Sequence, residues 1–165
     1  MSKRVVLITG ATSGYGLATA KKFRDSGDIV IVASRNAQKV NKVVEENGFD
    51  AGYAIDVTDY SAWENMKNRM IEKYGRIDVL VNNAGGGISI ADTTEQTKES
   101  IDGIVALNLN SVIYGSSIFG NVMKKQRDGI IINISSVCAR HCWGGWSVYA
   151  AAKAGVLNFT KGLYV

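Results

Sequence analysis

The residues most suggestive of chemistry are Tyr149 and Lys153, four positions apart near the end of the 165-residue chain. In a helix this spacing places both side chains on one face, one turn apart. An ammonium beside a phenol favours the ionised phenol, which can then exchange a proton at neutral pH. The same spacing also occurs in ordinary surface pairs on amphipathic helices. The pair therefore predicts acid-base chemistry only in the company of further site residues.

A glycine-rich turn follows the first apolar run of the chain. Residues 9–16 read Thr-Gly-Ala-Thr-Ser-Gly-Tyr-Gly, with Gly10, Gly14 and Gly16 as the glycines. A pyrophosphate needs close backbone approach, free N–H groups and a helix N-terminus, all of which a strand-to-helix turn supplies. The spacing is neither G-x-G-x-x-G nor a P-loop, and a purely structural turn is the alternative. We predict that this turn binds a dinucleotide.

The end of the second apolar run bears on the choice of cofactor. An acidic residue there would bind the ribose 2′-hydroxyl of NAD, but the chain reads Ala-Ser-Arg-Asn at positions 33–36. The planar, charged fork of Arg35 suits a 2′-phosphate, which a carboxylate would repel. The sequence therefore predicts NADP(H) over NAD(H). The alternative is that Arg35 is a solvated loop charge.

Short apolar runs alternate with helical patterns along the whole chain. The strand candidates, which are nearly continuous in apolar character, are Arg4–Thr9, Asp28–Ala33, Gly52–Ile55, Ile77–Val81 and Ile130–Ile134. Helices are expected from about Tyr15 to Gly27, after Asn36, from Thr58 or Asp59 to Gly75, from about Thr94 to Lys125, and from Ser147 onward. Strands of this kind are buried on both faces. The pattern predicts one doubly wound, parallel α/β domain over residues 1–165, a Rossmann-like three-layer α/β/α sandwich.

Several motifs, in order along the chain, resemble the short-chain dehydrogenase/reductase family. They are the glycine turn, Asp56-Val57, Asn82-Asn83-Ala84-Gly85, Asn108, Ser135-Ser136 and Tyr149-Ala-Ala-Ala-Lys153. The resemblance covers the whole chain, and the set is far more specific than any one motif. It implies an oxidoreductase that transfers a hydride between NADP(H) and a carbonyl compound or secondary alcohol.

The resemblance also implies a role for each matching residue. Tyr149 is the expected general acid and base, Lys153 binds the nicotinamide ribose, and Ser136 bonds the substrate oxygen, with Ser135 as the weaker choice. Asn108, in a locally distorted helix, is expected to place a water that links Lys153 to solvent. The expected cofactor-binding residues are Gly10, Thr12, Ser13, Gly14, Tyr15, Gly16, Arg35, Asp56, Val57, Asn83, Ala84, Gly85, Tyr149 and Lys153. Asn108 could instead be a buried amide satisfied by backbone, and Asp56 could also serve as a turn residue.

One loop invites a different interpretation, because Cys138, His141 and Cys142 could ligate zinc. A second ligand cluster is missing from the sequence, so we expect no metal. With Trp143 and Trp146, this loop is a better candidate for a wall of an apolar substrate pocket.

Members of the family continue beyond the equivalent of Val165, so we expect a C-terminally truncated domain. A truncated, non-catalytic dinucleotide-binding module is the alternative function. An exposed fifth strand would then favour aggregation or pairing with a partner.

Composition excludes several other classes of protein. The formal net charge is +4, from 19 Lys and Arg against 15 Asp and Glu, and the basic residues are spread through the predicted helices. The dense basic run with aromatics that is typical of nucleic-acid binding is missing, as is an apolar run of membrane-spanning length. Two cysteines make no disulfide framework, and Val5–Ile8 is too short for a signal sequence. We expect a cytoplasmic protein with a small-molecule substrate, no nucleic-acid or membrane partner, and the option of a homo-oligomer.

Overall fold

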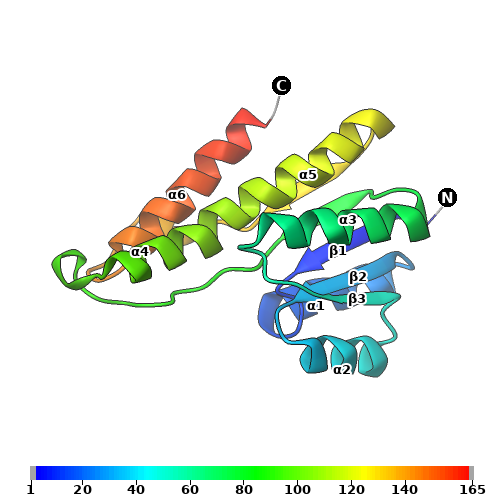
Figure 1. Ribbon diagram of the computed structural model, residues 1–165, viewed down its shortest axis with the longest axis horizontal. Helices are drawn as coiled ribbons and strands as arrows, with labels where there is room; N and C mark the ends of the chain where they lie inside the picture. Colours follow the sequence, from blue (N-terminus) through cyan, green and yellow to red (C-terminus); the bar gives the residue numbers. More distant parts are fainter. Residues whose placement is uncertain (1–2, 164–165) are drawn as a thin grey trace.

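Figure 1 shows the computed structural model, which describes residues 3–163. Within them, five parallel strands form one sheet in the order β3-β2-β1-β4-β5. The strands are β1 (Val5–Thr9), β2 (Ile29–Ser34), β3 (Ala51–Ala54), β4 (Val79–Asn82) and β5 (Ile130–Asn133). After β3 the chain crosses back to place β4 beside β1. Ligands of open α/β sheets bind at such a switch point, outside the carboxyl ends of the strands.

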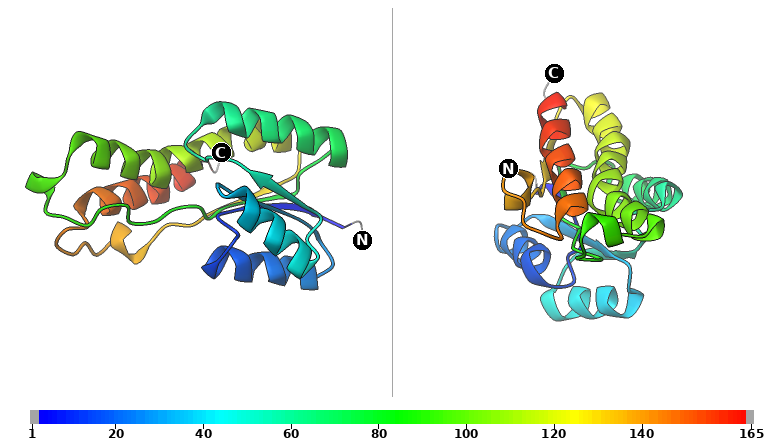
Figure 2. Two further views of the ribbon diagram at one scale, coloured as in Figure 1. Left: turned by 60° about the horizontal axis from the view of Figure 1, so that its bottom comes forward. Right: turned by 90° about the vertical axis from the view of Figure 1, so that its left-hand side faces the viewer.

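Helices cover both faces of the sheet (Figures 1 and 2). One face carries α1 (Gly14–Asp25) and α2 (Ala37–Asn47), and the other carries α3 (Tyr60–Tyr74), α5 (Ser111–Gln126) and α6 (Ser147–Gly162). Helix α4 (Lys98–Val105) runs into α5 through the π turn η2 (Ala106–Asn110). Two short 3-10 turns are η1 (Thr93–Glu95) and η3 (Val137–Ala139). The predicted doubly wound α/β fold is confirmed.

The core explains why the central strands are apolar at every position. Successive strand residues point to opposite faces. In β1, Val5 and Leu7 join a cluster with Trp63 of α3, whereas Val6 and Ile8 join a cluster with Val40 of α2. All four β1 residues are at most 2% exposed. The two clusters hold the outer helix layers onto the sheet.

The fourth predicted helix is shorter and less regular than expected. It begins at Lys98 rather than near Thr94, because the Thr97 hydroxyl caps it by accepting from the Ser100 N–H at 3.2 Å. Residues 93–95 form a separate 3-10 turn. Of the two residues expected to cap α3, Thr58 and Asp59, the cap is Asp59, because its carboxylate accepts from the Ser61 N–H at 2.8 Å.

The expectation that β5 is buried on both faces is wrong. Ile130, Ile132 and Ile134 are 53%, 39% and 40% exposed. Ile131 points the other way, toward the groove between α5 and α6. Helices α5 and α6 pack against the face of β5 that carries Ile131, whereas the face with Ile130, Ile132 and Ile134 is left exposed.

The helical stretch Lys98–Gln126 is long enough to cross a membrane, and its most apolar 18-residue window has a mean hydropathy of 1.2. However, 44% of its most apolar window is buried, and α5 packs against α3, β4 and β5. A helix that is apolar on several sides is common in the core of an α/β protein. We therefore interpret it as a core helix.

Candidate active site

The turn after β1 has the backbone that close approach to a ligand requires. Gly10 and Gly14 have φ angles of +65° and +54°, which side chains rarely tolerate. A Cβ on Gly16 would lie 2.4 Å from the Gly10 carbonyl oxygen, so α1 can pack here only with glycine at this position. Ser13 precedes α1 without capping it through its side chain, which leaves the first N–H groups of α1 to an outside acceptor. These features fit the phosphates of a dinucleotide.

The end of β4 is fastened to this turn by Thr9, a residue that the sequence analysis did not single out. The buried Thr9 hydroxyl accepts from the N–H groups of Asn83 and Ala84 at 3.1 and 3.0 Å. In return, the Asn83 amide donates to the Thr9 carbonyl oxygen at 2.9 Å. A polar residue at the end of a fully apolar strand was the only available signal. The two predicted binding segments are thereby joined across the switch point.

A pocket of about 250 Å³ opens between these segments and β2. It is lined by Gly10, Thr12, Ser13, Ser34, Arg35, Ile55, Val57, Ala84, Gly85 and Leu107. Seven of these ten were expected to bind cofactor, whereas Ser34, Ile55 and Leu107 were missed. The Thr12 hydroxyl donates to that of Ser34 at 3.3 Å, which ties the turn to the end of β2. Five segments that are separate in sequence therefore line one small pocket.

Other expected cofactor residues lie near the pocket without lining it. Tyr15 is 89% exposed on the first turn of α1. The Asp56 carboxylate accepts from both the N–H and the hydroxyl of Thr58, at 2.9 and 2.8 Å, so the alternative turn role is present. Only one of its oxygens, Oδ1, takes part in these bonds, which leaves Oδ2 available to a ligand.

Arg35 is exposed at the rim of the pocket. Within residues 3–163 its guanidinium takes part in none of the ion pairs. Its charge is thus free to meet an anionic group of a ligand.

Lys153 is the most unusual ionisable residue of the structure, because it is only 3% exposed. Its Nζ donates to the Ile134 carbonyl oxygen at 3.0 Å and lies 5.8 Å from the centre of the Tyr149 ring. Burial lowers the pKa of Lys153 below its ordinary value, since the charged form loses hydration. Helix α6 thus presents a buried ammonium beside the half-buried Tyr149.

The two serines after β5 make different hydrogen bonds. The Ser135 hydroxyl donates to the Lys153 carbonyl oxygen at 2.8 Å and so anchors α6. The Ser136 oxygen accepts from the Cys138 N–H at 3.2 Å, as a cap of η3. Because this bond uses only the oxygen, the Ser136 hydroxyl proton stays available to a substrate, whereas that of Ser135 is committed.

Asn108 is fully buried in the π turn between α4 and α5. Its amide donates to the carbonyl oxygens of Gly86 and Ile104 at 2.9 and 3.0 Å, and its Oδ1 accepts from the Gly86 N–H at 2.9 Å. Satisfaction by backbone, the alternative drawn from the sequence, is therefore present in the structure. Its visible role is to fix the chain that leaves β4.

Gly85 connects the cofactor pocket to these residues. It lines the pocket, and a Cβ built on it would lie 2.9 Å from Asn108 Oδ1 and 3.0 Å from Lys153 Nζ. The glycine lets both polar groups approach the backbone at the pocket wall. Gly85 therefore joins the cofactor pocket to Asn108 and Lys153, and Lys153 in turn lies beside Tyr149.

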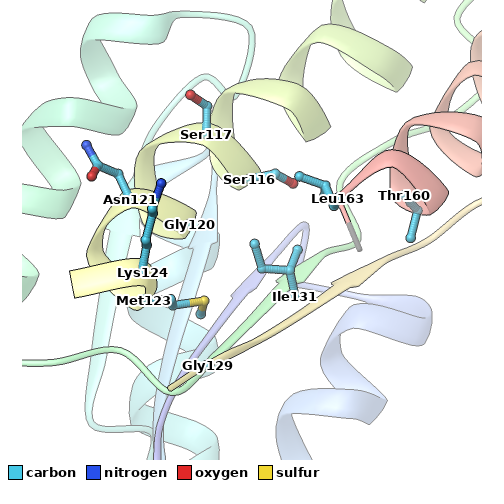
Figure 3. Close-up of a pocket in the computed structure, with 10 residues that line it drawn as sticks. All are labelled: Ser116, Ser117, Gly120, Asn121, Met123, Lys124, Gly129, Ile131, Thr160 and Leu163. Carbon is cyan, nitrogen blue, oxygen red and sulfur yellow. The ribbon is translucent and has the colours of Figure 1, made fainter. Parts of the chain in front are cut away.

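A larger groove, of about 960 Å³, lies between α5, β5 and the end of α6. Figure 3 shows Ile131 at its floor, between Met123 on one side and Thr160 and Leu163 on the other. None of the predicted site residues lines it. Seven of the expected cofactor-binding residues line the smaller pocket instead.

The zinc interpretation of the 138–142 loop finds no support in residues 3–163, which contain no cluster of three suitable ligands. Cys138 is buried and Cys142 is exposed, and both are free thiols.

The fold and the site define a dinucleotide-binding α/β protein, and comparison with known proteins gives its family. A model described as short chain dehydrogenase matches residues 4–165, and the chain belongs to that family. It is 38% identical over 162 residues to 3-oxoacyl-(acyl-carrier-protein) reductase of Thermotoga maritima. It is 37% identical over 165 residues to meso-2,3-butanediol dehydrogenase of Serratia marcescens.

These alignments cover 96% and 97% of this chain but 65% and 64% of the two relatives. A structure of an actinorhodin polyketide ketoreductase variant with NADPH superposes with a TM-score of 0.92 at 33% identity, over 98% of this chain and 64% of that one. The chain thus spans less than two thirds of the length of these relatives.

Proposed function

We propose that this chain is the NADP(H)-binding domain, residues 1–165, of an oxidoreductase that interconverts a carbonyl compound and a secondary alcohol. The observation that carries the proposal is the junction at Gly85, where the cofactor pocket meets buried Lys153 beside Tyr149. If the glycine turn were purely structural and Tyr149 and Lys153 were an ordinary surface pair, the pocket and the pair would have no reason to meet at one glycine. Membership of the short-chain dehydrogenase family supports the same reaction class.

The residues present fit a nicotinamide dinucleotide. The glycine turn and the uncapped N-terminus of α1 would hold the pyrophosphate, and Val57 and Ala84 would flank the adenosine half. The free charge of Arg35 would bind a 2′-phosphate, and a relative solved with NADPH supports this choice of cofactor. The bound nicotinamide supplies or accepts the hydride.

The chain's own residues handle the proton. Tyr149 would donate its phenolic proton to the substrate oxygen during reduction and take it back during oxidation. The buried Lys153 ammonium would stabilise the phenolate that Tyr149 leaves behind and bind the ribose hydroxyls. The unused Ser136 hydroxyl proton would hold the substrate oxygen, while Asn108 keeps Gly86 in place. A water beside Asn108 would return protons from solvent to Lys153.

The surroundings of Tyr149 favour an apolar substrate. Several large apolar side chains are exposed on the two loops beside the site, namely Ile88, Ile90, Val137 and Trp143. They would bury the hydrocarbon part of a small carbonyl compound or alcohol. We propose a cytoplasmic enzyme without nucleic-acid or membrane partners, and a homo-oligomer is compatible with the proposal.

The proposal is tested by replacing the phenol alone. In Tyr149→Phe, loss of the proton donor should lower kcat by at least about 100-fold with a panel of apolar ketones. The dissociation constant for NADPH, followed by tryptophan fluorescence, should stay within about threefold, because the binding turn is unchanged. Full activity of Tyr149→Phe, or a wild type that binds no nicotinamide cofactor, would sink the proposal.

A second candidate is a dinucleotide-binding module without catalysis. The cofactor pocket favours it, because none of Ser136, Tyr149 and Lys153 lines that pocket. Quenching of tryptophan fluorescence by NADPH without turnover of any carbonyl compound would distinguish the module from the enzyme.

A further inference from the structure

Trp146 lies directly against the tyrosine to which the proposed function gives the proton transfer. The two rings are 5.4 Å apart at their centres and inclined by 72°, an edge-to-face pair. Trp146 is also the residue that begins α6, since its carbonyl oxygen accepts from the Ala150 N–H at 2.8 Å and its N–H donates to Trp143 at 3.1 Å. Its backbone is thereby fixed on both sides, which leaves the indole direction to be set by its neighbours.

The indole lies close against the backbone of Gly87, where a side chain would press on it. A Cβ built on Gly87 would lie 3.1 Å from Trp146 Cζ3 and 3.3 Å from Cη2, closer than ordinary van der Waals contact. The adjacent Gly86, and Gly144 in the loop before Trp146, have open space at the same position. The absence of a side chain thus matters at residue 87 and not at its neighbours.

Residues 86–97, here named the strap, are the part of the connection between β4 and α4 that contains Gly87. The strap runs beside the loop before α6 (Figure 2). Its Thr93 hydroxyl and that of Ser147 are 2.5 Å apart, and Ile90 Cγ2 is 3.1 Å from a Cβ built on Gly145. Asn108 holds the start of the strap through Gly86. Three successive residues before Tyr149 are therefore in contact with the strap.

We infer that Trp146 is a positioning residue for Tyr149, held against Gly87 by the strap. Tyr149 is the third residue of α6, close to a helix end, where the backbone is held less firmly than in the interior. The packed indole restricts the tilt of the phenol ring and so keeps its hydroxyl aimed at the substrate oxygen. The inference rests on the proposed role of Tyr149. It adds Trp146 and Gly87, which take no part in the proton transfer itself, as residues that position the phenol.

The test combines changes on both sides of the contact. Trp146→Ala should lower kcat by about threefold to tenfold, because this is the factor that corresponds to the stabilisation of an edge-to-face pair. Trp146→Phe keeps an aromatic edge and should stay within about threefold of wild type. Gly87→Ala should lower kcat about threefold to tenfold by displacing the indole. Gly144→Ala is the matched control and should leave kcat unchanged.

The double variant gives the decisive comparison. Phenylalanine lacks the outer Cζ3 and Cη2 atoms that meet a Cβ at residue 87, so Gly87→Ala should have little effect on kcat in the Trp146→Phe protein. The KM for the ketone and the dissociation constant for NADPH should stay within about threefold throughout, and melting temperatures serve to exclude global unfolding. A merely structural role of Trp146 would instead lower the melting temperature and leave the kcat of the folded enzyme unchanged.

Two results would overturn the inference while leaving the proposed function intact. One is an active wild type whose kcat is unaffected by Trp146→Ala. The other is a Gly87→Ala effect of equal size with tryptophan and with phenylalanine at position 146. A wild type that turns over no carbonyl compound would instead defeat the proposed function, and the inference with it.

Discussion

At the scale of single residues, the site contains a charge that folding must bury. Lys153 has one hydrogen-bond acceptor, the Ile134 carbonyl oxygen, and no carboxylate partner among residues 3–163. Burial therefore lowers its pKa, which means that the folded state binds this proton more weakly than the unfolded state does. A buried lysine that weakens the fold is typical of a residue retained for function.

The pH dependence of stability follows from this shift. Below the lowered pKa of Lys153 the wild type bears the full cost of burying the ammonium, and this cost disappears as pH rises to the ordinary value of 10.5. Relative to Lys153→Met, the wild type should thus gain stability as pH rises from the lowered pKa of Lys153 to 10.5. Thermal unfolding of both proteins at several pH values measures the difference between their stabilities. A stability difference that does not change with pH, or in which the wild type loses stability relative to Lys153→Met as pH rises, would contradict the burial of a charged Lys153.

Lys153→Met should also separate stability from activity. Without the ammonium beside Tyr149, kcat should fall by about 100-fold or more. The melting temperature at pH 7 should not fall with it, because methionine fills the buried space without a charge. Loss of both together would indicate that Lys153 acts mainly in folding.

Arg35 carries the predicted preference for NADP(H). In Arg35→Asp, the carboxylate should repel the 2′-phosphate and accept bonds from a 2′-hydroxyl, so the ratio of NADPH to NADH affinity should drop at least about tenfold. Titration of tryptophan fluorescence with each cofactor measures this ratio. Arg35→Gln is the control that removes charge without reversing it and should fall between the two. An unchanged preference in Arg35→Asp would mean that Arg35 is a solvated loop charge.

The sequence alone predicted which residues are candidates for the site, but not which hydrogen bonds those residues make. The spacing of Tyr149 and Lys153 fixes a shared helix face, because helical geometry is local. The spacing does not show that the Ser135 hydroxyl donates to the Lys153 carbonyl oxygen, whereas the Ser136 hydroxyl only accepts a hydrogen bond. Nor does it reveal Thr9 or the Trp146–Gly87 contact, since these depend on strands and loops distant in sequence.

At the scale of elements, apolar runs predicted the strands well because β1, β2 and β4 are covered on both faces. For β5 the apolar run predicted the strand correctly but not its burial, since Ile130, Ile132 and Ile134 are exposed on one face. The start of α4 was also misplaced, since the cap at Thr97 competes with a polar, helix-compatible stretch before it. The pattern of apolar residues shows which side chains of a segment can be buried. Whether they are buried depends on which other elements pack against that segment in the fold.

Helix α5 offers a test of element packing at two of its glycines. A Cβ on Gly115 would lie 2.6 Å from both Asn82 Oδ1 and the buried Trp63 ring, whereas one on Gly120 would be at an ordinary 3.6 Å from Ile131. Gly115→Ala should therefore destabilise the protein by ~1–3 kcal/mol through overpacking. Gly120→Ala, on the same helix, should be neutral or stabilising by up to ~1 kcal/mol. Urea unfolding measures both, and equal effects would contradict this account of how α5 packs.

At the scale of the whole molecule, the two faces of the sheet are covered unequally. Helices α1 and α2 lie over the β3-β2-β1 side of one face, and the clusters of buried residues continue beneath them. On β5 the same face presents Ile130, Ile132 and Ile134. Alternate isoleucines on an edge strand form an apolar strip beside unpaired backbone groups, which is a common route to association between chains.

For the 165-residue polypeptide, this strip predicts self-association that depends on β5. Replacing all three exposed isoleucines by threonine keeps a β-branched residue at each position but removes apolar area. Burial of one isoleucine contributes ~1–2 kcal/mol, so association should weaken by at least about tenfold. Sedimentation velocity over a range of concentrations would measure the change, with Tyr60→Ser, at an exposed residue of α3, as the control. If the triple variant and the control sediment like the wild type, the strip does not drive association, and the edge of β5 must be protected by its twist or by solvation alone.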